Sequence, residues 1–482
     1  MKRSIWGYLL VATLLSACAE DYSLANYAEE EAALLDPDGE FTENPFVIVE
    51  EEPTSTFSVD ADGGSYVLAR RSILEQKQMP DANDIRIEEF INYFPLDYPK
   101  PEGEAPIALN GEISTCPWAT ENLLMRVGIQ GRDIPVEEWQ GSNIVLLIDV
   151  SGSMNGADRL GLLQYGFKKM VESFNPGDRI AIVTYAGNSG VHLESTNVAE
   201  SSKIIKAIDD LSSGGSTNGA DGIITAYEIA QQHFIEGGNN RVILGTDGDF
   251  NVGITNQDEL IALIEEKREQ GVFLTTVGVG NGNYQDGQLE QIANHGNGTY
   301  EYIWNEEQAE KVFVHEFKKL LTVAKDVKVQ VHFDPNQIKA YRLIGYENRL
   351  LDNEDFLDDT EDAGEIGANQ NVTALYELIP ATSAQEGAPS FTIDFRYKEP
   401  DAASSEPLEL TVPFAPSTFQ EASENHRFVS AVAAYGMLLR NSEYAGSATL
   451  TKVLDWAQEA DNFDPFGYRA AFKQLIMATM DL

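Results

Sequence analysis

A short polar stretch follows an apolar run in the sequence NIVLLIDVSGSMNG, which covers residues 143–156. The apolar residues 145–148 are typical of a strand that is buried on both faces of a parallel sheet. Asp149, Ser151 and Ser153 then place one carboxylate and two hydroxyl groups at alternate positions just beyond that run. Because Mg²⁺ prefers oxygen ligands and retains several of its waters, this stretch is suited to a divalent cation.

Two later segments carry oxygen atoms of the same kind. Thr217 lies in the glycine-rich turn GGSTNGAD, and Asp247 follows the apolar run RVILGT. Together with Asp149, Ser151 and Ser153 they offer three hydroxyls and two carboxylates, which leaves room in the six-coordinate shell of Mg²⁺ for a carboxylate from another protein. We therefore expect these five residues to bind a metal, Mg²⁺ first and Mn²⁺ or Ca²⁺ as the alternatives, for binding rather than catalysis.

An alternation of strands and helices would bring these segments together. From residue 143 to about residue 323, apolar runs of strand length alternate with amphipathic helical segments, the last of them over residues 307–321. This order predicts a doubly wound, mostly parallel α/β sheet with helices on both faces. Ligands bind such sheets at the carboxyl ends of the strands, which is where Asp149 and Asp247 fall.

The motifs DVSGSM, GGSTN and TDGDFN resemble the metal-ion-dependent adhesion site (MIDAS) of von Willebrand factor type A (VWA) domains. The later segment VGVGNGNYQDGQLEQIANHGNGTYEYI is similar to the final strands of that family. The resemblance implies a Rossmann-like fold in which Ser151, Ser153 and Thr217 contact the metal, with Asp149 and Asp247 acting directly or through water. It also implies a protein partner that offers a carboxylate to the metal.

The segments on either side of this region resemble a bacterial family of VWA lipoproteins. The similar stretches include STFSVDADGGSYVLARR, IRIEEFINYFPLDYP and KAYRLIGYENRLL. We predict an N-terminal VWA-associated domain over residues 44–140, the VWA domain over 141–323, and a C-terminal domain of unknown function over 324–482 that is first β-rich and then helical. Apolar residues alternate in 123–129 and in 327–333, which predicts that the VWA domain is inserted into one β-sandwich.

The N-terminus predicts a lipoprotein. A basic start and an apolar middle precede residues 15–18 (LSAC), which resemble the bacterial lipobox, so residues 1–18 are expected to be a signal peptide and Cys18 to be acylated. Residues 19–43 are acidic and predict an extended tether. Because Ala19 is not an acidic retention signal, we expect the lipid to anchor the protein in the outer membrane, facing the periplasm or the cell surface. Cys116 is expected to be a buried core residue.

The net charge and the absence of certain motifs in the sequence reduce the number of possible functional classes. The formal net charge of −45 excludes non-specific nucleic-acid binding. The six histidines have no metal-ligand spacing such as HExxH, and the chain has no GxSxG elbow or phosphate-binding loop, which disfavours an enzyme. The sequence favours a non-enzymatic lipoprotein that binds a protein partner through a divalent cation. The alternatives are an envelope assembly scaffold with metal-independent partners and, less favoured, a metal-dependent hydrolase.

Overall fold

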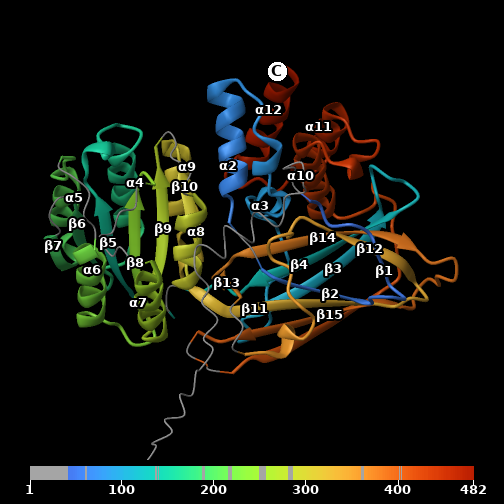
Figure 1. Ribbon diagram of the computed structural model, residues 1–482, viewed down its shortest axis with the longest axis horizontal. Coiled ribbons are helices and arrows are strands. Elements are labelled where there is room, and N and C mark those ends of the chain that lie inside the picture. The colour runs from blue at the N-terminus through green and yellow to red at the C-terminus, as the bar shows by residue number, and fades with distance from the viewer. Residues whose placement is uncertain are drawn as a thin grey trace, which may run out of the picture.

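The computed structural model describes residues 42–59, 62–135, 138, 140–186, 190–214, 220–248, 257–280, 286–359, 363–400, 402 and 404–482. Cys18 and Thr217 lie outside these residues. The described chain forms an α/β domain beside a β-sandwich, with a group of helices above the sandwich (Figure 1).

The α/β domain is built on a six-stranded sheet with the order β10-β9-β8-β5-β6-β7. Neighbouring strands are parallel, except that β7 runs antiparallel to β6 at one edge. The strands are β5 (Ser142–Asp149), β6 (Arg179–Tyr185), β7 (Gly190–Asn197), β8 (Asn239–Thr246), β9 (Phe273–Val279) and β10 (Tyr300–Ile303).

Helices cover both faces of this sheet. The central strand β5 is buried along its whole length, with Val145 and Leu147 in one core and Ile144, Leu146 and Ile148 in another. Helices α6 (Ala220–Gln232), α7 (Gln257–Glu269) and α8 (Asp286–His295) pack in the first core, and α4 (Leu160–Ser173) and α5 (Ser201–Asp209) pack in the second. The predicted doubly wound α/β fold is therefore confirmed.

The β-sandwich is formed by segments from both sides of the α/β domain. One sheet has the order β1-β12-β14-β4-β3, and the other has the order β13-β11-β15-β16 with β2 also paired to β11. Met125 and Val127 of β4, which precede the α/β domain, share one core with Val329 and Val331 of β11, which follow it. The α/β domain is thus inserted into a single sandwich, as the alternating residues predict. The strands are β1 (Val47–Ile48), β2 (Thr54–Ser58), β3 (Ile107–Thr115), β4 (Leu123–Gly131), β11 (Thr322–Phe333), β12 (Ile338–Ile344), β13 (Gly364–Gly367), β14 (Asn371–Pro380), β15 (Pro389–Lys398) and β16 (Glu406–Pro413).

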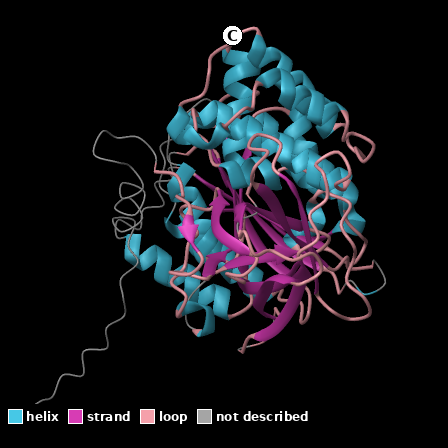
Figure 2. Ribbon diagram, turned by 90° about the vertical axis from the view of Figure 1, so that its right-hand side faces the viewer, coloured by secondary structure: helices cyan, strands magenta, loops and turns pink. Residues whose placement is uncertain are grey.

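A layer of helices packs on one side of the sandwich (Figure 2), and its helices come from both ends of the described chain, blue and red in Figure 1. Phe94 contacts Phe428 with ring centroids 5.0 Å apart, although the two residues are far apart in sequence. Cys116 is buried in the same core, as expected, and burial raises the pKa of its thiol. These helices are α2 (Gly64–Arg71), α3 (Ile87–Asn92), α10 (Glu424–Arg440), α11 (Leu450–Gln458) and α12 (Tyr468–Met480).

The helix expected over residues 307–321 is instead a succession of three kinds of helical turn. α9 (Glu306–Glu310) continues as a π-helix at Lys311–His315 and a 3₁₀ turn at Phe317–Leu320. The wider π-turn brings residues five apart to the same side, and the Lys311 ammonium lies 2.5 Å from a carboxylate oxygen of Glu316. Both side chains are buried, so this ion pair compensates two charges that the regular helix would have separated.

Candidate metal-binding site

The polar residues predicted to bind a metal lie where two adjacent parallel strands end. Asp149 is the last residue of β5, and Ser151 and Ser153 follow in the turn that contains the 3₁₀ helix Gly152–Met154. Asp247 comes directly after β8, which pairs with β5 in parallel. The carboxyl ends of the two strands therefore bring both aspartates to the same edge of the sheet.

Hydrogen bonds link four of the five predicted residues. The Ser151 N–H donates to Oδ1 of Asp149 at 2.8 Å, and the hydroxyl oxygens of Ser151 and Ser153 are 2.8 Å apart. The Ser153 hydroxyl in turn donates to Oδ1 of Asp247 at 3.3 Å. Asp149, Ser151, Ser153 and Asp247 thus form one continuous set of oxygen atoms, and Thr217 is the predicted member that falls outside the described residues.

Two residues that the sequence interpretation missed complete the surroundings. The Thr246 hydroxyl donates to Oδ2 of Asp149 at 3.3 Å, so the Asp149 carboxylate is held from both sides. Arg159 donates from Nη1 to the carbonyl oxygen of Ser153 and lies 3.5 Å from Oδ2 of Asp247. Thr246 stands beside Asp247 in the TDGDFN motif, which is a signal that could have identified it. No comparable signal marks Arg159 in the sequence.

The electrostatics of the site fit a divalent cation. Burial raises the pKa of Asp149 to about 6, hydrogen bonds from Ser151 oppose the rise, and the nearby charge of Asp247 adds to it. A buried carboxylate close to a second carboxylate is stabilised by a cation between them. Among the described residues, no group of three or more His, Cys, Asp or Glu side chains is placed to hold a metal. The oxygen atoms that the structure brings together at this edge of the sheet are those of two carboxylates and two serine hydroxyls. Hydroxyls and carboxylates are the donors that Mg²⁺ accepts.

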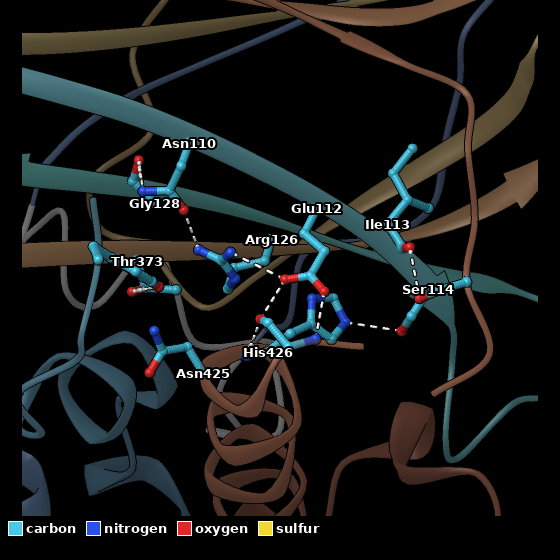
Figure 3. Close-up of polar contacts among 12 residues, drawn as sticks. Asn110, Glu112, Ile113, Ser114, Arg126, Gly128, Thr373, Asn425 and His426 are labelled. Atoms are coloured by element: carbon cyan, nitrogen blue, oxygen red, sulfur yellow. Dashed lines mark hydrogen bonds and ion pairs between the residues drawn. The ribbon is translucent and has the colours of Figure 1, made fainter. Parts of the chain in front are cut away.

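A second polar cluster lies between the N-terminus of α10 and the strands of the sandwich, and it has the composition of a hydrolytic triad (Figure 3). The Ser114 hydroxyl oxygen is 2.9 Å from Nε2 of His426, and Glu112 lies beside them. Both Ser114 and His426 are fully buried, and in the part of the chain that the structure describes Nδ1 of His426 has no hydrogen-bond partner. In a hydrolytic triad the carboxylate would bind Nδ1 of the histidine. Here the Glu112 carboxylate binds the guanidinium of Arg126 at 3.1 Å and accepts hydrogen bonds from Ser423. This cluster joins α10 to the sandwich.

The fold and the site together define a protein with a VWA domain. The model of the von Willebrand factor type A domain matches residues 143–316, and a von Willebrand factor model matches residues 39–126. Domains of this kind typically mediate protein interaction or adhesion.

The chain belongs to the YfbK family. The model of the C-terminal domain of uncharacterized protein YfbK matches residues 318–482. The uncharacterized protein YfbK of Escherichia coli (strain K12) is 40% identical over 462 residues, which cover 91% of this chain and 80% of that protein.

More distant similarities are confined to the fold or to part of the chain. A UPF0353 protein of Mycobacterium sp. (strain KMS) is 30% identical over 172 residues, which cover 33% of this chain and half of that protein. The match with a solved structure of von Willebrand factor type A from Catenulispora acidiphila has 17% sequence identity and a TM-score of 0.43, and it covers 77% of this chain and 89% of that one.

None of the described helices is long and apolar enough to cross a membrane.

Proposed function

We propose that this protein binds a partner protein through a divalent cation held at the carboxyl ends of β5 and β8. The observation that carries the proposal is the continuous set of oxygen atoms of Asp149, Ser151, Ser153 and Asp247, in which a buried carboxylate faces serine hydroxyls. Mg²⁺ is the cation that we favour, because the donors are hard oxygens and only two of them are carboxylates.

Each residue of the site has a distinct part in this binding. The cation, when bound, attracts a carboxylate oxygen of the partner. Asp149 would hold the cation, and its orientation is set by the Ser151 N–H and the Thr246 hydroxyl. Ser151 and Ser153 would supply neutral oxygens, which leave the bound cation with positive charge for the partner. Arg159 contacts Asp247 and the Ser153 carbonyl, so it keeps the turn and the second strand end together.

The proposed site is tested by thermal unfolding in Mg²⁺ and in EDTA. A ligand that binds only the folded state at 100 times its Kd stabilises that state by about 2.7 kcal/mol. We expect Mg²⁺ to raise the Tm of the wild type and to leave the Tm of Asp149→Ala unchanged. Asp209→Ala is the matched control, because Asp209 is an exposed residue of the same domain that pairs with Lys168, and it should keep the wild-type shift. Equal shifts in Asp149→Ala and wild type would exclude this site.

The partner-binding part of the proposal needs its own experiment. Partners captured from detergent-solubilised envelope by the immobilised wild-type protein should be retained in Mg²⁺ and released by EDTA. The same partners should be lost with Asp149→Ala and kept with Asp209→Ala. Partners that remain in EDTA and with Asp149→Ala would instead support an assembly scaffold.

We also propose that acyl chains on Cys18 anchor the protein in the outer membrane. The support for acylation is the LSAC sequence, and the support for the outer membrane is that Ala19 is not an acidic retention signal. Mass spectrometry of the mature protein should find an N-terminal cysteine with acyl mass, and Cys18→Ser should release the protein from the membrane fraction. A mature N-terminus without acyl mass would contradict the anchor.

A further inference from the structure

A cavity of about 350 Å³ lies between the α/β domain and the N-terminal helix α2. One wall is formed by the ends of β8 and β9 and includes Asp247, Gly248 and Val279. The opposite wall is formed by α2, by the π-helix Ser72–Gln76 and by the segment that follows it. Because Asp247 belongs both to the cavity wall and to the candidate metal site, the two are adjacent, and the cavity has the size of a small-ligand pocket.

A buried arginine fixes the inner wall of the cavity. Nη1 of Arg71 donates to the carbonyl oxygen of Gly280 at 3.2 Å and to the hydroxyl oxygen of Tyr302 at 2.5 Å. Its Nε lies 3.6 Å from a carboxylate oxygen of Glu75. The guanidinium is therefore already engaged with a carbonyl, a phenol and a carboxylate. It joins α2 to the end of β9 and to β10, and it is poorly placed to attract an anion into the cavity.

The remaining lining combines apolar side chains with carboxylates. Leu68, Met79 and Val279 provide apolar surface, and Met79 is half exposed at 50%. Asp81 is an exposed residue of the lining, and Asp247 stands at the side that faces the metal site. A group that fits this lining has a long apolar stem and a positive end, because the stem covers the apolar surface while the cation meets the carboxylates. Lysine and arginine side chains have this form.

We infer that this cavity receives a lysine or arginine side chain of the partner, in a segment whose nearby acidic residue offers its carboxylate to the metal. The acidic half of this inference rests on the proposed function, whereas the basic half stands on the cavity itself. The partner motif is therefore an acidic residue and a basic residue close together in sequence. The N-terminal helix α2 then belongs to the binding surface, so the recognition site extends beyond the VWA domain.

Short capped peptides can test the two halves separately. The probe is acetyl-Ala-Lys-Ala-Glu-Ala-amide, compared with versions in which arginine or norleucine replaces lysine, or glutamine replaces glutamate. Norleucine keeps the apolar stem and removes the charge. Binding is measured by ligand-observed saturation-transfer NMR on the full chain in Mg²⁺ and in EDTA. We expect the lysine or the arginine peptide to bind about three- to tenfold more tightly than the norleucine peptide, as one or two partly exposed ion pairs allow.

Variants of the cavity provide the second comparison. Asp81→Asn removes a carboxylate but keeps an oxygen that can accept the Asn83 N–H, which Asp81 binds at 3.0 Å. Combined with Asp84→Asn, which removes a second carboxylate of the lining, it should clearly weaken the preference for the basic peptides, because only the Asp247 carboxylate then remains. Glu386→Gln with Glu409→Gln is the matched control, because it removes two exposed carboxylates from the sandwich region and should keep the preference.

The outcomes separate the inference from the proposed function. If the norleucine peptide binds as tightly as both basic peptides, if the Asp81→Asn and Asp84→Asn protein keeps the preference, or if no peptide binds in the low-millimolar range, the cavity inference is wrong. If the basic preference persists while EDTA and the glutamine peptide change nothing, the cavity inference stands and the metal site fails. A preference for arginine over lysine, or the reverse, identifies the side chain.

Discussion

The buried ion pair between Arg342 of β12 and Glu377 of β14 allows a quantitative test of how the sandwich is held to its helical layer. The two side chains are 2% and 4% exposed, and Nη2 of Arg342 lies 3.1 Å from Oε2 of Glu377. Trp118 and Asn122 also donate to the Glu377 carboxylate, at 3.3 Å and 2.6 Å. The Arg342 guanidinium lies over the ring of Tyr444 at 4.1 Å, so the pair connects the sheet to the loop after α10.

We expect Arg342→Met to destabilise the protein severely. The methionine keeps much of the apolar stem but removes the cation, so Glu377 remains as a buried carboxylate with two N–H donors. Removing one member of a buried ion pair costs about 3–5 kcal/mol, and the two remaining donors place the expected loss near the lower value, about 3 kcal/mol. Arg342→Met combined with Glu377→Met removes both charges and should recover to within about 2 kcal/mol of the wild type.

Urea unfolding followed by tryptophan fluorescence measures these differences, because Trp118 is buried beside the pair. The four proteins needed are the wild type, Arg342→Met, Glu377→Met and the double variant. Their unfolding free energies give the coupling between the two residues. If the double variant is no more stable than Arg342→Met, the charges do not compensate each other and the reasoning is refuted. The Mg²⁺-dependent Tm shift should survive in the double variant, since the pair lies outside the α/β domain.

Two further predictions concern packing and pH. Gly367→Ala should cost about 3 kcal/mol, because a Cβ at this position would lie 1.9 Å from the backbone oxygen of Lys319, whereas Gly177→Ala meets nothing within 4 Å and should unfold like the wild type in urea. Burial lowers the pKa of His426, so at mildly acidic pH the unfolded chain binds a proton that the folded chain does not. The free energy of unfolding should therefore fall by about 2 kcal/mol as the pH drops from about 6.5 to about 5. Burial raises the pKa of Glu112, but the hydrogen bonds from Ser423 and the charge of Arg126 hold it below its usual 4.5, so Glu112 titrates below this window. A His426→Gln variant with the wild-type dependence of unfolding free energy on pH would contradict this assignment.

Most of the α/β domain and its site could be predicted from local sequence patterns. The apolar run that ends at Asp149 and the similar run before Asp247 each predict a strand of the parallel sheet, and the structure shows that the two strands are neighbours. A parallel sheet brings the carboxyl ends of its strands to one edge, so the motifs DVSGSM and TDGDFN predict that both aspartates lie at that edge. Their adjacency follows from the pairing of β5 with β8. Alternation in residues 123–129 and 327–333 likewise predicts two strands that share a core, and the structure confirms this. The expectation that residues 123–129 form a half-buried strand is wrong, because β4 is buried along its whole length and its other face packs in the core of the helical layer.

Other features of the site depend on contacts between distant parts of the chain. Arg159 follows Ser153 by six residues, but its contact with Asp247 exists only because β5 and β8 are neighbours. The cavity needs the stretch from Ser65 to Ile85 to pack against the ends of β8 and β9, and the link between Arg71 and Gly280 joins residues 209 positions apart. No periodic pattern encodes such pairs.

The sequence by itself determined the alternation of strands and helices in the α/β domain, the oxygen-rich strand ends and the alternating residues of the sandwich strands, because these follow from the chemistry of neighbouring residues. The tertiary structure alone decided which layers meet. It placed α2 and α3 with α10, α11 and α12, and it turned the expected helix over 307–321 into a π-turn that pairs Lys311 with Glu316. The physical reason is that charged and apolar side chains are buried by contacts between segments that are far apart in sequence. The energy of an ion pair or an aromatic contact depends on the partner residue, and no local pattern specifies that partner.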